Sequence, residues 1–310
     1  MSKKISWKRI LKWTLAVVVG FLFLMLFVVG PLFLSSIAVN RRFQFRDPLI
    51  GKTPSDLGMP YQEVVFSSPP NVTLYGWYIP GDRQATAVIF CHGLNRSRVE
   101  MLPQAQFVHS LGFSALLFDL RHHGKSTGDK STFGAKEKDD VLAAASWMHN
   151  RQPHSKILLW GISMGAASAM LAAAENPGID SVICDSTYIS FKETVDHHVH
   201  LFFGLPPWPI GREIGALMQW RGDFRGAQID IREAVRKIGT RPVMFVAQAE
   251  DRRMPSSYAR ELYGLCSSPY KRLLILNGRR HGHAYRDHPA EYQKAVREFL
   301  EASGLFRKAD

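Results

Sequence analysis

The segment ILLWGISMGAASAM, residues 157–170, is the most informative part of the sequence for the architecture of the protein. It begins with a continuous apolar run, passes through Gly161, Ser163 and Gly165, and continues into a segment rich in alanine. A short apolar run fits a strand that is covered on both faces, and the alanine-rich segment favours a helix. A serine between two glycines is typical of a sharp strand-to-helix turn, because only small neighbours avoid clashes there. The pattern therefore predicts a strand, a tight turn that exposes a serine, and a helix.

Further short apolar runs lie on both sides of this stretch, such as AVIFC at 87–91 and VMFVA at 243–247. Strands are expected at 63–67, 74–79, 87–91, 114–119, 157–160, 181–185, 243–247 and 272–276. Helical patterns lie between several of them, at 136–150, 164–175, 256–265 and 290–302. This alternation predicts an α/β fold with a mostly parallel eight-stranded sheet and helices on both faces.

Two polar stretches follow expected strands near the C-terminus. QAEDRRMP occupies 248–255, and NGRRHGH occupies 277–283. The carboxyl ends of parallel strands meet at one edge of the sheet, where such folds bind their ligands. A nucleophilic serine needs a base, and an imidazole with a pKa near ~6.5 can accept its proton at neutral pH. We therefore expect Ser163 to be the nucleophile, His281 its base, and Asp251 the carboxylate that orients the imidazole.

Each of the last two residues has alternatives in the sequence. His283 is a second candidate base, and His92 is a third, although its loop is better suited to another role. Asp185 ends an expected strand and is a second candidate acid. Glu250 is less suitable, because its side chain points away from that of the adjacent residue.

The segment CHGLN, residues 91–95, directly follows the strand AVIFC. Acyl transfer develops negative charge on a carbonyl oxygen, and each donor that stabilises this oxyanion is typically worth ~3 kcal/mol of the barrier. The loop after this strand and the residue after the nucleophile supply backbone donors in folds of this kind. We expect the N–H groups of Leu94 and Met164 to form the oxyanion hole.

The order Ser163, Asp251, His281, with each residue at a strand end, resembles the α/β-hydrolase superfamily across roughly residues 61–303. DLRHHGKS at 119–126 resembles a loop of that superfamily, and its role here is expected to be structural. Gln248 departs from the pattern, because the superfamily usually has a glycine before the acid. The nearest resemblance is to single-pass, membrane-anchored bacterial hydrolases, which are similar to serine aminopeptidases, acyl-esterases and depalmitoylating thioesterases. The resemblance implies a serine hydrolase that needs no cofactor and no metal.

One segment, at about 188–241, interrupts the alternation of strands and helices. It contains the apolar and aromatic stretches FFGLPPWPIG and EIGALMQW. An insert that leaves a strand at its carboxyl end covers the ligand site, so we expect a helical lid. The alternative is a packing element without substrate contact. The histidines of this segment, His197, His198 and His200, lack the accompanying ligands of a metal site and are expected on an exposed edge of the lid.

The N-terminal region has the composition of a membrane-spanning segment. Residues 13–40 contain no charged side chain, and about 20 apolar residues suffice to cross the hydrocarbon layer. We expect a basic flank at 1–12, a transmembrane helix at 13–40, a connector at 41–62, and the α/β-hydrolase domain at 63–310. The alternatives are a cleaved signal peptide, for which the apolar run is too long, and a buried core helix. Five basic residues precede the span and three follow it, which favours a non-cytoplasmic domain, in a bacterium a periplasmic one.

The net charge of +12 is concentrated near the N-terminus. Residues 1–46 hold eight basic side chains and no acidic one. The remainder holds 31 basic and 27 acidic side chains, a net charge of +4. A nucleic-acid-binding domain carries its charge as a basic patch on the folded surface, so no nucleic-acid partner is expected. Three cysteines provide neither a disulfide framework nor a zinc spacing.

Together these features predict a membrane-anchored serine hydrolase. Its substrate is expected to be a small-molecule or lipid-like ester or thioester with an acyl group, and its bilayer contact is expected through residues 13–40. A peptidase or aminopeptidase on the same triad is the first alternative. A catalytically silent binding protein on the same fold is the second. The oligomeric state and the identity of the substrate stay open.

Overall fold

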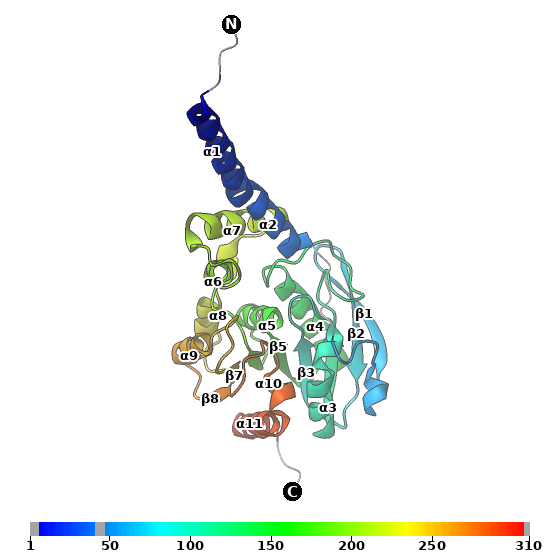
Figure 1. The fold of residues 1–310 in the computed structure, drawn as a ribbon. Helices are drawn as coiled ribbons and strands as arrows, with labels where there is room; N and C mark the ends of the chain where they lie inside the picture. The colour runs from blue at the N-terminus through cyan, green and yellow to red at the C-terminus, as the bar shows by residue number, and fades with distance from the viewer. Residues whose placement is uncertain (1–5, 41–46, 307–310) are drawn as a thin grey trace.

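An eight-stranded sheet forms the centre of the molecule in the computed structural model, which describes residues 6–40 and 47–306 (Figure 1). The strands lie in the order β1-β2-β4-β3-β5-β6-β7-β8. β1 and β2 are antiparallel to their neighbours, and the other pairs are parallel. Their bounds are β1 Gln62–Ser68, β2 Val72–Ile79, β3 Arg83–Cys91, β4 Phe113–Phe118, β5 Lys156–Ile162, β6 Ser181–Asp185, β7 Val243–Gln248 and β8 Lys271–Leu276. The expected mostly parallel α/β sheet is confirmed.

Helices cover both faces of this sheet. α3 (Leu102–Ser110) and α11 (Pro289–Ala302) pack on one face, and the short α10 (Ala284–Asp287) precedes α11. The other face carries α4 (Glu137–Arg151), α5 (Met164–Glu175), α8 (Ile231–Lys237) and α9 (Ser256–Leu265). Every residue of β4 is buried, as in a strand covered on both sides. The two hydrophobic cores hold the carboxyl edge of the sheet rigid.

Several strands are longer than the apolar pattern predicts, and β5, for example, spans Lys156–Ile162 rather than 157–160. β2 begins at Val72 rather than 74, and β3 begins at Arg83 rather than 87. The extra residues of β3 precede its apolar run, and the pairing with β4 shifts register between Arg83 and Ala87. Hydrophobic periodicity detects the buried part of a strand, so polar residues paired beyond the core escape it.

The expected lid is formed by two helices above the carboxyl ends of the strands. α6 (Phe191–Phe203) and α7 (Arg212–Gly222) are joined through a segment that includes a kinked turn, Pro207–Gly211, in which Trp208 has an extended backbone. An isolated bridge between Ser190 and Asp230 closes the base of the insert. α8 lies in the same sequence insert but packs against α5 and α9 in the layer that covers the sheet. The roof over the strand ends therefore consists of α6 and α7.

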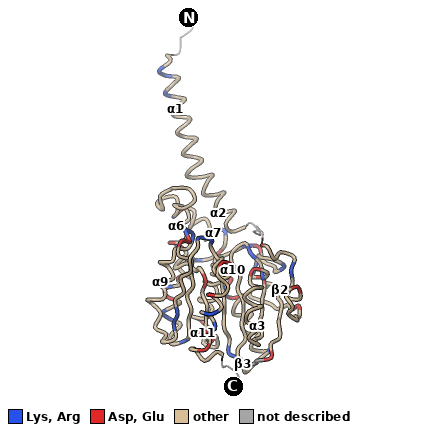
Figure 2. Tube along the Cα trace, turned by 60° about the horizontal axis from the view of Figure 1, so that its bottom comes forward, with Lys and Arg blue, Asp and Glu red and all other residues tan. Residues whose placement is uncertain are grey.

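A continuous helix of 34 residues, Trp7–Asn40, precedes the domain. It comprises α1 (Trp7–Leu24), a π-helical turn at Met25–Val29 and α2 (Gly30–Asn40). Its most apolar window has a mean hydropathy of 2.8 and is only 6% buried, so the helix is long and apolar enough to cross a membrane. Charged residues in it lie near its N-terminal end (Figure 2). It begins six residues before the expected start at 13.

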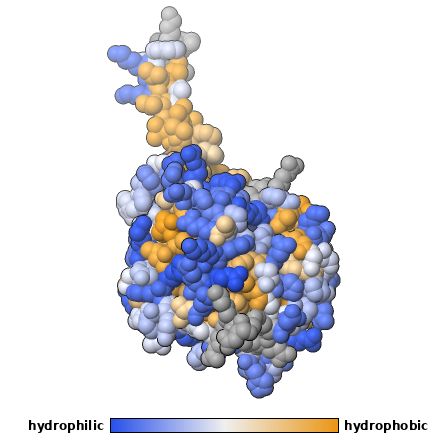
Figure 3. All heavy atoms as spheres, turned by 90° about the horizontal axis from the view of Figure 1, so that it is seen from below, coloured by the Kyte–Doolittle hydropathy of each residue, from blue (hydrophilic) through white to orange (hydrophobic). Residues whose placement is uncertain are grey.

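The helix projects from one end of the domain, whose opposite end is largely hydrophilic (Figure 3). The last turns of the helix pack against α7, and Ser35 and Val39 are fully buried there. Of the basic residues that frame the apolar span, Lys3, Lys4, Arg41, Arg42 and Arg46 lie outside the described residues.

Candidate active site

Ser163 occupies the sharp turn between β5 and α5. Its backbone has a φ of 55° and a ψ of −116°, a strained conformation for a residue with a side chain. Glycine is required on both sides. A Cβ on Gly161 would lie 2.4 Å from the carbonyl carbon of Gly165, and one on Gly165 would lie 2.1 Å from the carbonyl oxygen of Cys91. The turn thus packs directly on the end of β3 and holds the serine hydroxyl at the edge of the sheet.

His281 connects Ser163 to Asp251. Its Nε2 lies 2.9 Å from Ser163 Oγ, and its Nδ1 lies 2.7 Å from Asp251 Oδ2. The second carboxylate oxygen of Asp251 accepts the backbone N–H groups of Arg253 and Met254 at 2.8 and 3.0 Å. Because these two amides fix the carboxylate, the imidazole is held in the tautomer that donates from Nδ1 and accepts at Nε2. The three residues named from the sequence are therefore brought together.

The two alternative acids have other environments. Asp185 is fully buried and accepts hydrogen bonds from the hydroxyls of Tyr292 and Ser186. Burial raises the pKa of Asp185 to about 7. Glu250 is exposed at the surface. The carboxylate that contacts His281 is that of Asp251.

The alternative bases do not contact the serine in the described part of the chain. His283 is half-buried, and its Nδ1 lacks a hydrogen-bond partner among the described residues. His92 is fully buried, where its Nδ1–H donates to the carbonyl of Gly93 and its Nε2 accepts the N–H of Leu120. Burial lowers the pKa of His92 to about 4, so this imidazole stays neutral and holds two loops together.

The loop after β3 lies beside the serine. Gly93 lies beside Ser163, since a Cβ on it would be 3.7 Å from the serine Cβ. The N–H of Gly93 donates to the buried carboxylate of Glu100 at 2.7 Å. Among the described residues, the N–H groups of Leu94 and Met164 donate to no acceptor. Both amides therefore remain available to an oxygen bound beside the nucleophile.

Glu100 and His123 are positioning residues that the sequence analysis did not single out. Burial raises the pKa of Glu100 to about 6, and this carboxyl contacts Arg96 as well as Gly93. His123 accepts the N–H of Asn95 at 3.1 Å, and burial lowers its pKa to about 4. Both residues hold the backbone of the Gly93–Asn95 loop. A lone Glu at a helix start and a lone His in a loop have no distinctive spacing, so no sequence signal separated them from surface residues.

The loop at 119–126 contributes hydrogen bonds within the protein. The Asp119 carboxylate accepts the backbone N–H groups of Arg98 and Lys125, and Arg121 donates to both oxygens of Asp140. The bond from Lys125 closes the loop on itself, and the bonds with Arg98 and Asp140 tie the loop after β4 to adjoining elements. The loop takes part in no contact with Ser163 among the described residues, in agreement with a structural role.

Gln248 stands where the superfamily usually has a glycine, and the turn before Asp251 is nevertheless formed. The Gln248 side chain is fully buried, and its Nε2 donates to Asp287 at 2.8 Å. A Cβ on Gly278 would lie 2.4 Å from this nitrogen, so glycine at 278 provides the space for the larger side chain. The end of β7 and the loop after β8 are thus packed closely against each other.

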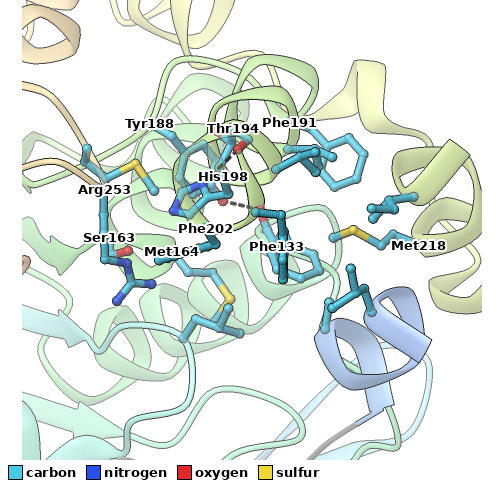
Figure 4. A pocket seen from close by; sticks show the side chains of 18 residues that line it. Phe133, Ser163, Met164, Tyr188, Phe191, Thr194, His198, Phe202, Met218 and Arg253 are labelled. Atoms are coloured by element: carbon cyan, nitrogen blue, oxygen red, sulfur yellow. Dashed lines mark hydrogen bonds between the residues drawn. The ribbon is translucent and has the colours of Figure 1, made fainter. Parts of the chain in front are cut away.

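A cavity of about 260 Å³ extends from Ser163 beneath the roof (Figure 4). Its lining is predominantly aliphatic and aromatic: Leu34, Ala38, Leu94, Phe133, Met164, Tyr188, Phe191, Thr194, Val195, His198, Val199, Phe202, Phe203, Ile214, Met218, Arg253 and Met254. The guanidinium of Arg253 lies near the serine, and its Nε has no hydrogen-bond partner among the described residues. Such a chamber, with polar groups at one end, suits an apolar ligand that reacts at its polar end.

The expectation for the lid histidines is wrong for His198. This residue lines the cavity instead of an exposed edge, and its Nδ1–H donates to the carbonyl of Thr194. Burial lowers the pKa of His198 to about 4, so its ring is neutral at pH 7. His197 contacts the carbonyl of Arg252, and His200 is exposed. Residues three or four apart on a helix share a face, but which face meets the cavity depends on how α6 docks.

Comparisons with known proteins agree with this architecture. Residues 82–213 match the model of the family described as serine aminopeptidase, S33. An uncharacterized Bacillus subtilis protein, YqkD, is 29% identical over 229 residues, which cover 73% of this chain and 74% of that protein. An uncharacterized membrane protein of Saccharomyces cerevisiae is 21% identical over 80% of this chain and 87% of its own.

A solved esterase from Pyrococcus furiosus, Pf2001, is similar in both structure and sequence. It superimposes with a TM-score of 0.68 and 28% sequence identity, covering 80% of this chain and 93% of the esterase. The family match and this similarity support hydrolase activity. With the sheet order and the serine turn between β5 and α5, they identify the chain as a member of the α/β-hydrolase superfamily.

Proposed function

We propose that the protein is a membrane-anchored serine hydrolase that cleaves an ester or thioester of a lipophilic acyl substrate. One observation carries the proposal: His281 bridges Ser163 and Asp251 at the inner end of an apolar cavity. A nucleophile, a base and an orienting acid in hydrogen-bonding contact form the constellation that acyl transfer needs.

In the proposed reaction, Ser163 Oγ attacks the carbonyl carbon while its proton passes to His281 Nε2. Asp251 stabilises the resulting imidazolium, and the N–H groups of Leu94 and Met164 stabilise the oxyanion. The tetrahedral intermediate expels the alcohol or thiol, which takes the proton from His281. Water then attacks the acyl-enzyme with His281 again as the base, and the serine is regenerated as the free acid leaves. These steps require residues of this chain and water.

The lining of the cavity favours an acyl substrate over a peptide with a free amine. An aminopeptidase needs acidic side chains beside the nucleophile to hold the substrate ammonium, and no described lining residue is acidic. The lid does contain six acidic residues. Four of them form ion pairs with basic side chains: Glu193 with Arg232, Asp196 with Lys192, Asp223 with Lys136, and Glu233 with Arg236 and Lys237. Asp230 is the N-cap of α8, and Glu213 does not line the cavity.

The docking of α2 supports retention of the N-terminal segment. Cleavage after Ala38, which a signal-peptide reading requires, would remove the buried Ser35 from its contact with the domain and leave Val39 at a new terminus. We therefore propose a single-pass anchor. The excess of basic residues before the span favours a domain on the non-cytoplasmic side, which is the periplasmic side in a bacterium.

A fluorophosphonate probe tests the proposal on the full-length protein in detergent. We expect labelling of the parent and loss of labelling in Ser163→Ala, together with hydrolysis of nitrophenyl esters whose rate rises with acyl length to an optimum above acetyl. Ser168→Ala is a matched control, because Ser168 is buried in α5 and bonds to the carbonyl of Met164. A parent that neither reacts with the probe nor hydrolyses any ester, thioester or amide is the silent binding protein, and the proposal is then wrong.

A further inference from the structure

The cavity beside Ser163 is lined in part by the membrane helix. Leu34 and Ala38, one turn apart on α2, line it together with Phe133, Ile214 and Met218. The end of α2 flanks the cavity on the side of Met218, opposite Ser163 (Figure 4). We infer that α2 is a wall of the acyl pocket, and that Leu34 and Ala38 set the length of the acyl chain that the pocket accepts from the bilayer. This inference rests on the proposed hydrolase function.

The wall is a fixed part of the domain. Arg221 on α7 donates from Nε to Ser35 Oγ at 3.2 Å, and the N–H of Ser131 donates to the carbonyl of Val39 at 3.0 Å. Ser35 and Val39 are fully buried, one residue beyond Leu34 and Ala38 respectively. Hydrogen bonds to two different parts of the domain, α7 and the segment at Ser131, therefore hold the lining residues at a constant distance from the nucleophile. A flexible tether would not provide such a wall.

The free part of the helix is long enough to span the bilayer without α2. Trp7–Val29 contains no buried residue, and its uncharged part, residues 13–29, is about 26 Å long at a rise of 1.5 Å per residue. The long side chains of Lys8, Arg9 and Lys12 can reach the polar interface beyond this part. The hydrocarbon layer is ~30 Å thick. The docked segment Gly30–Asn40 then lies at the membrane surface, and the roof of the cavity lies there with it.

The cavity reaches the surface beside exposed aromatic residues. Phe202 and Phe203 line it at the end of α6, yet they are 57% and 49% exposed. Trp208 and Trp220, in the turn before α7 and in α7 itself, are 71% and 73% exposed. α6 and α7 lie next to the helix where it leaves the domain (Figure 1). Tryptophan is enriched at membrane–water interfaces. The lipid surface is therefore the partner that fits this opening, and an acyl chain can enter the pocket without crossing water.

Tryptophan substitutions in the wall test the inference in the full-length protein in lipid nanodiscs. The readout is the ratio of kcat/KM for a dodecanoyl nitrophenyl ester to that for the butyryl ester. Leu34→Trp and Ala38→Trp fill the far end of the pocket, and the ratio should fall about tenfold because two or more methylenes lose their apolar contacts. Leu32→Trp is the matched control: Leu32 is exposed two residues away and does not line the cavity, so its ratio should equal that of the parent.

The outcomes separate this inference from the proposed function. If the parent shows no Ser163-dependent hydrolysis, the proposed function itself is wrong. If the parent hydrolyses the esters but Leu34→Trp and Ala38→Trp keep its ratio, only the inference is wrong. If both tryptophan variants misfold, Leu34→Ala decides, because an enlarged pocket should raise the ratio for the hexadecanoyl ester over the dodecanoyl ester. An unchanged ratio in that variant also overturns the inference.

Discussion

The edge of the sheet and the roof above it are built by different means. At the edge, the carboxylates of Asp251 and Glu100 and the imidazole of His281 are each held by hydrogen bonds with defined partners. Under the roof, residues such as Val195, Ile214 and Met218 present apolar side chains that pack by shape alone. The difference separates two tasks. In the proposed function, the edge carries out one chemistry on any acyl group that reaches it, whereas the roof and the wall formed by α2 determine which group fits.

The largest effect expected from this division is a loss of activity that does not depend on chain length. His281→Ala should lower kcat/KM by ~10⁴-fold or more for all esters alike, because the serine loses its base. His283→Ala, two residues away, should change kcat/KM by less than ~3-fold, since His283 contacts neither Ser163 nor Asp251 among the described residues. Kinetics on nitrophenyl esters of two to sixteen carbons provide the measurement. A loss confined to long chains in His281→Ala would contradict the division.

The two aspartates at neighbouring strand ends give the next largest contrast. Asp251→Asn should lower kcat by ~10³–10⁴-fold, because an amide does not enforce the required imidazole tautomer. In Asp185→Asn, the amide can still bond to Tyr292, so kcat should fall by less than ~10-fold. Equal losses in the two variants would contradict the assignment of the orienting role to Asp251 alone.

A polar group placed under the roof should lower kcat/KM mainly for esters with long acyl chains. Met218→Gln should lower kcat/KM for dodecanoyl esters by ~10–30-fold, since burying an amide against an acyl chain costs about 1–3 kcal/mol. Butyryl esters should be affected several-fold less. Met218→Leu, which keeps the apolar volume, serves as the control. A uniform loss over all chain lengths would mean that the roof also supports the chemistry.

The last prediction concerns how the free energy of unfolding depends on pH. Asp185, at the end of β6, should contribute to this dependence. Its folded pKa of about 7 lies above the unfolded value of ~3.9, so the folded state binds the extra proton. This contribution is complete below about pH 4 and is lost as the pH rises to about 7. Relative to the parent, Asp185→Asn should therefore gain about 3 kcal/mol of unfolding free energy between pH 4 and pH 7. Chemical denaturation at several pH values measures it, and a constant difference would be the contrary result.

His92, His123 and His198 act on stability in the opposite direction over the same pH range. Burial lowers the pKa of each to about 4, below the unfolded value, so their contribution is present above about pH 6.5 and is lost as the pH falls toward 4. Because these opposing groups are common to the parent and Asp185→Asn, the comparison of the two proteins isolates Asp185.

Much of the edge could be predicted from the sequence because its residues follow strands. Ser163, Asp251 and His281 each come directly after an apolar run, and parallel strands bring such positions to one edge. Glu100, Asp140 and His123 could not be found this way. They lie in helices or loops, and their roles depend on which backbone amide or guanidinium the folded chain places beside them. His198 was assigned to the wrong surface for the same reason, since the docking of α6 decides which face meets the cavity.

The order of strands and helices, the sharp serine turn and the apolar character of the N-terminal helix can all be predicted from the amino-acid sequence. These follow from local propensity, side-chain volume and periodicity, which act over a few residues. Only the tertiary structure decided that the end of this helix packs against α7 and that Leu34 and Ala38 face the same cavity as Ser163. More than a hundred positions separate these residues along the chain. Apolar residues can be buried against many surfaces at similar free energy, and the packing of the whole domain selects one of them.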